Sequence, residues 1–286
     1  MKIRERAPGK LNLCLFLGPV RQDGRHELVT LFESVSLADE LVISLASSDE
    51  VIAPGVEGPN LVSQALAGLR RHGWRAPPLR IEIDKRIPIA GGMGGGSADA
   101  AALLRVAPRF APVGTVEVEE LAVELGADVP AQLIPGLAVG TGAGEDFSLR
   151  AALADHAFTI LPAATALSTA AVYAEADRLG LGRDRDELRA RLAELEASLE
   201  PGERLPNALL INDLEPATRS LCPQIDDALL ALRNAGADRV LVCGSGPTVA
   251  GLYWGADAEG RAQAAAASLV ARFPGATAAR PVASPS

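Results

Sequence analysis

A cluster of glycines between a predicted strand and a predicted helix is the strongest constraint on how this chain folds. Residues 85–104 read KRIPIAGGMGGGSADAAALL, and five of the six residues 91–96 are glycine. Glycine inside a regular element costs about 0.5–1 kcal/mol relative to alanine. The residues before the cluster, LRIEIDK at 79–85, alternate apolar and polar side chains as a half-buried strand does. The cluster therefore predicts a loop whose backbone must approach another group closely.

The residues after the cluster indicate that this group is an anion. We predict a helix from about Ser97 to Val106, and the first N–H groups of a helix are unpaired and carry partial positive charge. A loop without Cβ atoms at such a position is suited to phosphate. The predicted phosphate loop consists of Gly91, Gly92, Gly94, Gly95, Gly96 and Ser97. Ser97 is placed to cap the helix, to contact a phosphate or to help hold Mg²⁺.

Two common phosphate motifs do not fit this loop. A Walker sequence needs a lysine immediately before Ser97, where Gly96 stands. A dinucleotide-binding loop needs a surrounding βαβ unit and an acidic residue about 20 positions further on, and neither is found. The loop therefore predicts phosphate binding without naming either of these folds.

The bulk properties exclude several classes of protein. The formal net charge of −9 and the pI of about 5 argue against a nucleic-acid-binding surface, which is usually basic. No stretch of 18 apolar residues predicts a membrane span, and the N-terminal sequence lacks the apolar segment of a signal peptide. Three widely spaced cysteines and three histidines show no metal-ligand pattern, so we predict no protein metal site and a cytoplasmic location.

The order of predicted elements favours an α+β fold with antiparallel sheets. Strands are predicted at 2–6, 11–17, 28–45, 79–85, 157–163 and 239–254, the last with a central turn. APGK at 7–10 and the glycine-rich GLAVGTGAGE at 136–145 are predicted as turns between strands. Helices are predicted at 60–72, with Asn60 as the N-cap, and at 97–106, 116–126, 169–199, 213–234 and 257–271. Strands and helices come in grouped runs rather than strict alternation. We predict two domains, 1–150 and 151–286, and a frayed tail from residue 274.

Three further stretches accompany the glycine loop. APGKLNLCL at 7–15 places Lys10 and Asn12 at a strand edge, and LGADVPAQL at 125–133 places Asp128 just after a helix. CGSGPTVAGL at 243–252 is a second glycine turn between strands. Taken singly, these stretches also suit a surface lysine, a helix cap and an ordinary hairpin.

Together the stretches resemble the GHMP kinase superfamily. Its glycine-rich ATP motif is similar to PIAGGMGGGSADAA, and its C-terminal glycine motif is similar to GSGPTVAGL. Within the superfamily, DGRHELVTLFESVSL, LGADVP, TGAGE and NDLEPA resemble the branch that phosphorylates 4-diphosphocytidyl-2-C-methyl-D-erythritol. The resemblance implies a two-domain fold, ATP and Mg²⁺ as cofactors, and transfer of the γ-phosphate to the 2-hydroxyl of that small molecule in the cleft between domains. This is a step of the non-mevalonate route to isoprenoid precursors.

The resemblance also implies roles for particular residues. Lys10 and Asp128 match the catalytic pair, with Asp128 accepting the hydroxyl proton and Lys10 pairing with it. The positions that frame adenine are Asn60, Leu61, Lys85 and Ile89. The positions on the substrate side are Asn12, Arg25, His26, Phe32, Thr169 and Tyr173, together with Asp128 itself. His26 matches the residue that hydrogen-bonds cytosine, and Tyr173 matches an aromatic residue that stacks on it. Mg²⁺ would be held mainly by phosphates and water.

Arg25 departs from the family pattern. The family sequence DGYHEL has a tyrosine where this chain has Arg25. A guanidinium plane also stacks on a base, so cytosine recognition is either kept, weakened or changed. Two alternatives therefore stay open: another GHMP kinase, of the homoserine or mevalonate type, and a nucleotide-binding protein without catalysis. We expect a monomer or a weak homodimer, with no nucleic-acid or membrane partner.

Overall fold

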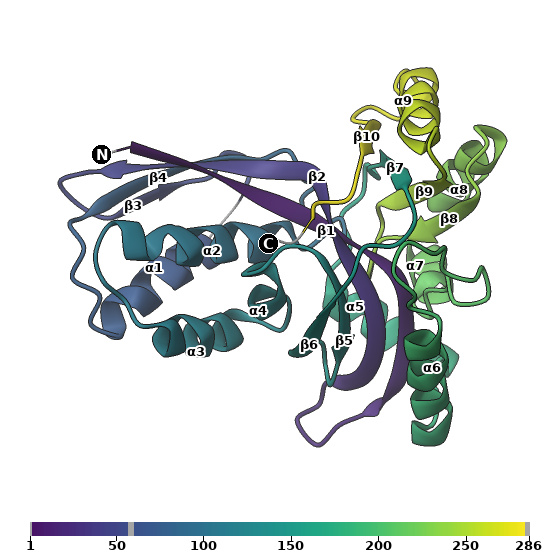
Figure 1. The fold of residues 1–286 in the computed structure, drawn as a ribbon, viewed down its shortest axis with the longest axis horizontal. Helices are drawn as coiled ribbons and strands as arrows, with labels where there is room; N and C mark the ends of the chain where they lie inside the picture. The colour runs from purple at the N-terminus through teal and green to yellow at the C-terminus, as the bar shows by residue number, and fades with distance from the viewer. Residues whose placement is uncertain (1, 57–59, 284–286) are drawn as a thin grey trace.

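A long, bent hairpin forms the spine of the molecule. The structure is a computed structural model, and it describes residues 2–56 and 60–283. Strand β1 (Lys2–Val20) pairs antiparallel with β2 (His26–Leu45) along almost its whole length. Figure 1 shows the two strands running from the outer end of one layer through the centre of the molecule. Both strands contribute residues to the cavity described below.

The continuity of β1 corrects the predicted turn at 7–10. The pairing register shifts between Pro8 and Lys10 instead of ending there. Pro8 has no N–H to give to the ladder, and the Lys10 N–H donates to the carbonyl of Met93 in the glycine-rich loop at 2.9 Å. The result is an irregularity of the β-bulge kind, which carries the strand on and links it to the loop.

The first sheet is built on this hairpin. Within the described residues, its strands follow the order β3-β4-β2-β5-β6, with β1 on β2. The other strands are β3 (Glu50–Ile52), β4 (Leu79–Asp84), β5 (Leu137–Thr141) and β6 (Asp146–Arg150). The β3–β4 pair is parallel and the remaining pairs are antiparallel. The glycine-rich segment predicted as a turn at 136–145 is therefore half strand, with the turn confined to 142–145.

Helices cover one face of this sheet, as Figure 1 shows. They are α1 (Leu61–Arg71), α2 (Gly95–Val106), η1 (Ala107–Arg109), α3 (Thr115–Leu125) and α4 (Asp128–Gln132). Ile43 and Ile81 of the sheet pack with Leu69 of α1 and Leu103 of α2 in one core. The Asn60 side chain accepts from the Ser63 N–H at 2.9 Å, so α1 has the N-cap that the sequence predicts.

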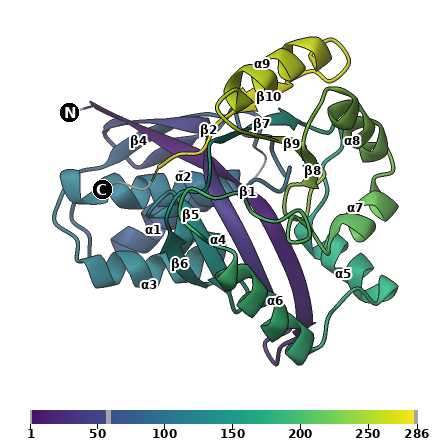
Figure 2. The ribbon, with the colours of Figure 1, turned by 45° about the vertical axis from the view of Figure 1, so that its right-hand side comes forward.

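A smaller antiparallel sheet lies in the C-terminal half. Its order is β10-β7-β9-β8, with β7 (His156–Leu161), β8 (Arg239–Val242), β9 (Val249–Trp254) and β10 (Thr277–Ala279). The helices here are α5 (Thr169–Leu179), α6 (Arg185–Ala197), α7 (Glu215–Leu221), α8 (Ile225–Asn234) and α9 (Ala258–Leu269). Helix α9 lies against β7 and β10 (Figure 2). None of the described helices is long and apolar enough to cross a membrane.

The tail beyond residue 274 is ordered where we predicted fraying. Strand β10 pairs with β7, and the Val282 N–H donates to the Ser34 carbonyl of β2 at 2.9 Å. The alanines and the threonine of this segment do not form a pattern that predicts a strand. The backbone partners of β10 lie on the edge of β7. Residues 284–286 of the predicted tail lie outside the described residues.

The two sheets share a core. Phe16 of β1, Phe158 of β7 and Leu252 of β9 belong to one buried cluster. The strands of the first sheet end at Arg150 and those of the second begin at His156, so a division at residue 150 stays our proposal for the domain boundary.

A buried ion pair joins the two sheets inside this core. The His156 Nε2 atom lies 2.7 Å from Glu33 Oε2, and both side chains are 3% exposed. The Nδ1 atom faces the Ala154 carbonyl at 2.7 Å. Both ring nitrogens therefore face acceptors, which favours the imidazolium form. Burial lowers the pKa of His156, but the hydrogen bond and charge of Glu33 outweigh it, so the pKa lies above its ordinary 6.5.

A second buried charge cluster ties the base of the glycine-rich loop to the sheet. Lys85 Nζ lies 2.7 Å from Asp99 Oδ2 of α2 and also donates to Asp39 of β2. The other oxygen of Asp39 accepts from the backbone N–H groups of Arg86, at 2.5 Å, and Ile87, at 2.8 Å. Burial raises the pKa of Asp99 to about 7, although Lys85 opposes that rise. The cluster holds the two ends of the loop together.

We expect the His156 imidazolium to make stability depend on pH. Because its folded-state pKa is raised, its contribution is complete below about pH 6.5 and is lost as the pH rises through the folded-state pKa. The difference in unfolding free energy between wild type and His156→Gln, from urea titrations, should shrink between about pH 6 and pH 9. His72→Gln, at an exposed histidine 3.7 Å from Glu124, is the control. A difference that is constant with pH would contradict the prediction.

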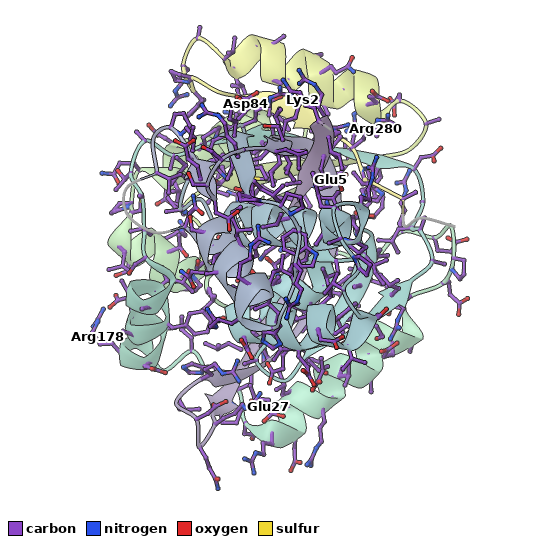
Figure 3. The ribbon with its side chains drawn as sticks, turned by 90° about the vertical axis from the view of Figure 1, so that its left-hand side faces the viewer. Lys2, Glu5, Glu27, Asp84, Arg178 and Arg280 are labelled. Atoms are coloured by element: carbon purple, nitrogen blue, oxygen red, sulfur yellow. The ribbon has the colours of Figure 1, made fainter. Side chains whose placement is uncertain are left out.

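We expect Lys85→Met to destabilise the protein strongly. It leaves two buried carboxylates without their cation, which costs about 3–5 kcal/mol. The effect should be measured at about pH 8, where Asp99 is ionised. Lys2, at the exposed start of β1 (Figure 3), supplies the matched variant Lys2→Met, with an expected change within about 0.5 kcal/mol. Equal stability of the two variants would show that the cluster carries no net energy.

Candidate active site

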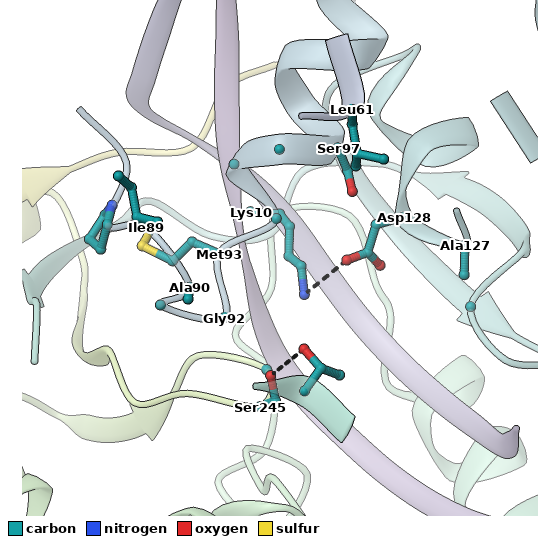
Figure 4. Close-up of a pocket in the computed structure, with 18 of the residues that line it drawn as sticks. Lys10, Leu61, Ile89, Ala90, Gly92, Met93, Ser97, Ala127, Asp128 and Ser245 are labelled. Atoms are coloured by element: carbon teal, nitrogen blue, oxygen red, sulfur yellow. Dashed lines mark hydrogen bonds and ion pairs between the residues drawn. The ribbon is translucent and has the colours of Figure 1, made fainter. Parts of the chain in front are cut away.

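A cavity of about 660 Å³ lies between the glycine-rich loop, the hairpin and the start of α5. Figure 4 shows Lys10 near its centre, with Asp128 and Ser97 to one side and Ile89 and Met93 to the other. Most of the predicted site residues line it: Lys10, Asn12, Phe32, Asn60, Leu61, Lys85, Ile89, Gly91, Gly92, Gly94, Gly95, Gly96, Ser97, Asp128, Thr169 and Tyr173. Residues far apart in the sequence thus meet at one place.

The glycine-rich loop leads directly into helix α2. Gly92 and Gly94 have φ values of +81° and +66°, a region that favours glycine. The helix begins at Gly95, two residues before the predicted start, and its N-cap is Gly94 without a side-chain hydrogen bond. Ser97 is therefore in the first turn and does not cap the helix. It lines the cavity. The unpaired N–H groups of this turn lie at the cavity, which is the arrangement expected for an anion site.

The two glycine motifs of the chain pack against each other by backbone. A Cβ atom on Gly92 would lie 1.9 Å from the Cys243 carbonyl oxygen and 2.6 Å from the Gly246 nitrogen. A Cβ atom on Gly244 would lie 2.8 Å from the Gly92 carbonyl oxygen and 3.2 Å from Lys10 Nζ. The turn between β8 and β9 therefore does not only connect two strands. Because its glycines have no side chains, it packs against one side of the glycine-rich loop.

Lys10 and Asp128 face each other across the cavity. Lys10 Nζ lies 3.8 Å from Asp128 Oδ2, and the lysine side chain is 10% exposed whereas that of Asp128 is 50% exposed. Asn12, two residues along the same face of β1, accepts from Lys10 Nζ at 2.7 Å and donates to Thr30 Oγ1 at 2.7 Å. This chain of hydrogen bonds fixes the ammonium group, and the more exposed carboxylate stands at the first residue of α4.

Tyr173 of α5 approaches the same carboxylate from the C-terminal half. Burial, and secondarily the charge of Asp128, raises the pKa of Tyr173 to about 12. Its ring centroid lies 5.3 Å from that of His26. Thr169 Oγ1, at the start of α5, is 3.2 Å from Ser245 Oγ in the β8–β9 turn. Ser245 and Gly244 line the cavity, and the sequence analysis assigned neither of them; their place in the second glycine motif was the available signal.

Arg25 and His26 lie outside the described lining of the cavity. His26 is buried behind Tyr173, with Nδ1 2.9 Å from the Gly18 carbonyl and Nε2 3.0 Å from Asp177. Arg25 is half exposed and pairs with Asp23 at 3.0 Å. Their roles toward a substrate therefore stay predictions.

The carboxylates in the lining do not form a protein cage for a metal. The described residues hold no group of three or more His, Cys, Asp or Glu arranged for a metal ion. Asp99 is committed to Lys85 through one oxygen, and Asp128 faces Lys10. Such a donor set fits Mg²⁺ only in the way that ion usually binds nucleotides, through phosphate oxygens and water with few protein ligands.

Both halves of this chain match models of one protein family. Residues 60–136 match the model of the GHMP kinases N terminal domain, and residues 183–274 match that of the GHMP kinases C terminal domain. The 4-diphosphocytidyl-2-C-methyl-D-erythritol kinase of Nocardia farcinica is 43% identical over 97% of this chain and 91% of its own. The protein of the same name from Streptomyces coelicolor is 40% identical over 87% of each chain.

Solved structures show the same fold. A crystal structure of 4-(cytidine 5'-diphospho)-2C-methyl-D-erythritol kinase has a TM-score of 0.75 and 32% identity, and the match covers 97% of this chain and 98% of that one. A homoserine kinase from Cytophaga hutchinsonii has a TM-score of 0.72, covering 99% of this chain and 95% of that one, but its 19% identity shows the fold alone. The long, high-identity matches and both domain models lead to one conclusion: this chain belongs to the 4-diphosphocytidyl-2-C-methyl-D-erythritol kinases of the GHMP kinase superfamily.

Proposed function

We propose that this chain transfers the γ-phosphoryl group of ATP to the 2-hydroxyl of 4-diphosphocytidyl-2-C-methyl-D-erythritol in the cavity described above. The observation that carries the proposal is the Lys10–Asp128 pair, 3.8 Å apart, beside a glycine-rich helix start in one cavity. Phosphoryl transfer depends on positioning and charge neutralisation, and this site supplies both. The family membership gives the ATP dependence, whereas the residue roles are our proposal.

Asp128 and Lys10 would carry the chemistry. Asp128 accepts the proton of the acceptor hydroxyl as its oxygen forms a bond to the γ-phosphorus. The bond between that phosphorus and the bridging oxygen breaks, and ADP leaves with the electron pair. Lys10, held by Asn12, orients the hydroxyl and offsets the charge that develops on the transferring group.

The remaining lining divides between the two substrates. Asn60, Leu61, Lys85 and Ile89 would frame the adenine, and Gly91, Gly92, Gly94, Gly95 and Gly96 would donate backbone N–H groups to the phosphates. The Ser97 hydroxyl would help to hold Mg²⁺, which would offset phosphate charge when bound. The acceptor would lie along Asn12, Phe32, Thr169 and Tyr173, with His26 behind Tyr173.

A coupled assay of ADP release tests the proposal. Purified protein receives ATP, Mg²⁺ and one acceptor at a time: the diphosphocytidyl compound, homoserine or mevalonate. Release with the first acceptor alone is expected. Release with another acceptor would replace the proposed substrate, and ATP binding without release for any acceptor would favour a binding protein that lacks catalysis.

The cysteines indicate the cellular compartment. We propose a cytoplasmic location, because Cys14, Cys222 and Cys243 are buried free thiols and a reducing compartment keeps them so. A monomer or weak homodimer stays our expectation. Sedimentation of the purified protein at several concentrations would decide between the two.

Asp128→Asn should separate catalysis from nucleotide binding. The amide no longer accepts the proton, so kcat should fall about 100-fold or more, while the dissociation constant for ATP measured by calorimetry stays within about twofold. Asp186→Asn, at a carboxylate 91% exposed on α6, is the matched control. Turnover by Asp128→Asn at the control's rate would remove Asp128 from the mechanism.

Gly92→Ala should weaken ATP binding. The new methyl group would occupy the place of the Cys243 carbonyl, at a φ of +81°. Relieving about 1–3 kcal/mol of strain requires the loop to move, so the dissociation constant for ATP should rise about tenfold or more. Gly260→Ala adds a methyl group to α9 in open space and should bind ATP like the wild type. Wild-type affinity in Gly92→Ala would mean that the loop binds phosphate in another conformation.

A further inference from the structure

The turn between β5 and β6 forms part of the cavity wall on the side of Asp128. Ala143 and Gly144 of this turn line the cavity. A Cβ atom on Gly144 would lie 3.7 Å from the Cβ of Ala127, the residue before Asp128. The Leu28 N–H of β2 donates to the Gly142 carbonyl at 2.7 Å, which attaches the start of the turn to the hairpin. Movement of this turn would therefore reach both the cavity wall and the segment that carries Asp128.

The turn has little intrinsic rigidity. Gly142 and Gly144 both have positive φ, at +69° and +105°. Glycine loses more conformational freedom on ordering than any other residue, so two glycines in a four-residue turn make its shape costly to hold. Another group must supply the restraint.

Glu145 supplies that restraint from inside the turn. Its Oε2 atom accepts from the Ala143 N–H at 2.7 Å, and its Oε1 atom accepts from Arg21 Nη1 at 2.5 Å. Arg25 Nη2 lies 3.7 Å from the same Oε1 atom. Asp23 lies 3.3 Å from Arg21 and 3.0 Å from Arg25. We call these four charged residues the Glu145 clasp; two guanidinium groups and two carboxylates balance within it.

The side chain of Glu145 is held more firmly than an ordinary surface carboxylate. It is 20% exposed, against 38% for the neighbouring Asp23 carboxylate. Burial raises the pKa of Glu145, but the hydrogen bonds from Arg21 and the backbone outweigh it and the pKa lies below its ordinary value. The carboxylate is therefore ionised at neutral pH, as the clasp requires.

We infer that Glu145 is a positioning residue for the acceptor, acting through the 142–145 turn on the cavity wall and on Asp128. Arg21 and Arg25 act through Glu145 by joining the β1–β2 turn to the β5–β6 turn. Arg25, where the family pattern has tyrosine, thus serves the site by holding its wall and not by contact with the acceptor. This inference rests on the proposed function for its kinetic test only.

Two substitutions of Glu145 distinguish its hydrogen bond to the Ala143 N–H from its charge interaction with Arg21. Glu145→Ala removes both the backbone acceptor and the charge. Glu145→Gln keeps an oxygen for the Ala143 N–H and loses the charge toward Arg21. Glu196→Ala is the matched control, because Glu196 pairs with Arg150 at the far end of the same β5–β6 hairpin, at 2.5 Å, outside the cavity lining.

Steady-state kinetics with ATP and the diphosphocytidyl acceptor give the first test. We expect Glu145→Ala to raise the KM for the acceptor about tenfold, in the range of coupling through a packed segment, and to change the KM for ATP less than about twofold. Glu145→Gln should lie between it and the wild type. Kinetics of Glu145→Ala equal to those of Glu196→Ala would overturn the inference.

The role of Arg25 is decided by a double-variant cycle. If Arg25 acts through Glu145, then Arg25→Ala adds little to Glu145→Ala, because residues in one network are not additive. Additive effects on the acceptor KM would show that Arg25 contacts the acceptor and would overturn this part.

Hydrogen exchange tests the clasp without any activity. In the free protein, Glu145→Ala should speed exchange of the amides of residues 142–145, whereas Glu196→Ala should not. Unchanged exchange would overturn the clasp even if the acceptor is phosphorylated. Faster exchange in a protein that phosphorylates no acceptor would retain the restraint on the turn and reject the proposed function instead.

Discussion

The hydrogen bond from the Lys10 amide to the Met93 carbonyl joins the two structures on which the site depends. It forms where Pro8 interrupts the β1–β2 ladder, so this irregularity in the pairing also anchors the glycine-rich loop. The same residue then sends its side chain between Asn12 and Asp128. Lys10 therefore anchors the glycine-rich loop through its backbone and supplies the proposed catalytic ammonium through its side chain.

Much of this site was predictable from local sequence. The strand, glycines and helix at 79–106 follow from periodicity and backbone freedom, and Asn60 was identified as an N-cap because its side chain bonds its own neighbours. Such features depend on residues a few positions apart. The continuity of β1 past residue 6 was missed because its backbone partners there are distant in the sequence: Asp39 and Ala38 of β2, and the Met93 carbonyl of the loop. Strand β10 was missed for the same reason, since the edge of β7 provides the order that its own residues do not.

The contact between the two glycine motifs shows a different limit of prediction from sequence. Each motif alone is consistent with a flexible turn, and only the approach of Gly92 to Cys243 and Gly246 explains why a side chain is excluded from both. Arg25 shows the converse. Resemblance assigns position 25 to the base of the substrate, but a guanidinium group beside Asp23 and Glu145 has stronger partners close at hand. Charge pairing with Asp23 and Glu145, which a motif does not record, decides where that side chain lies.

The charge of the cavity explains why the phosphate loop needs so many glycines. Lys10 and Lys85 are the cationic side chains among the described residues of the lining, in a protein of net charge −9. Lys85 is already neutralised by Asp39 and Asp99, so Lys10 is left to act on the reacting groups while it also faces Asp128. A triphosphate brought into such a site must find its remaining stabilisation in backbone N–H groups and in the start of α2. Those donors become accessible only where no Cβ stands in front of them, and a row of glycines beside a helix N-terminus is the arrangement that satisfies this requirement.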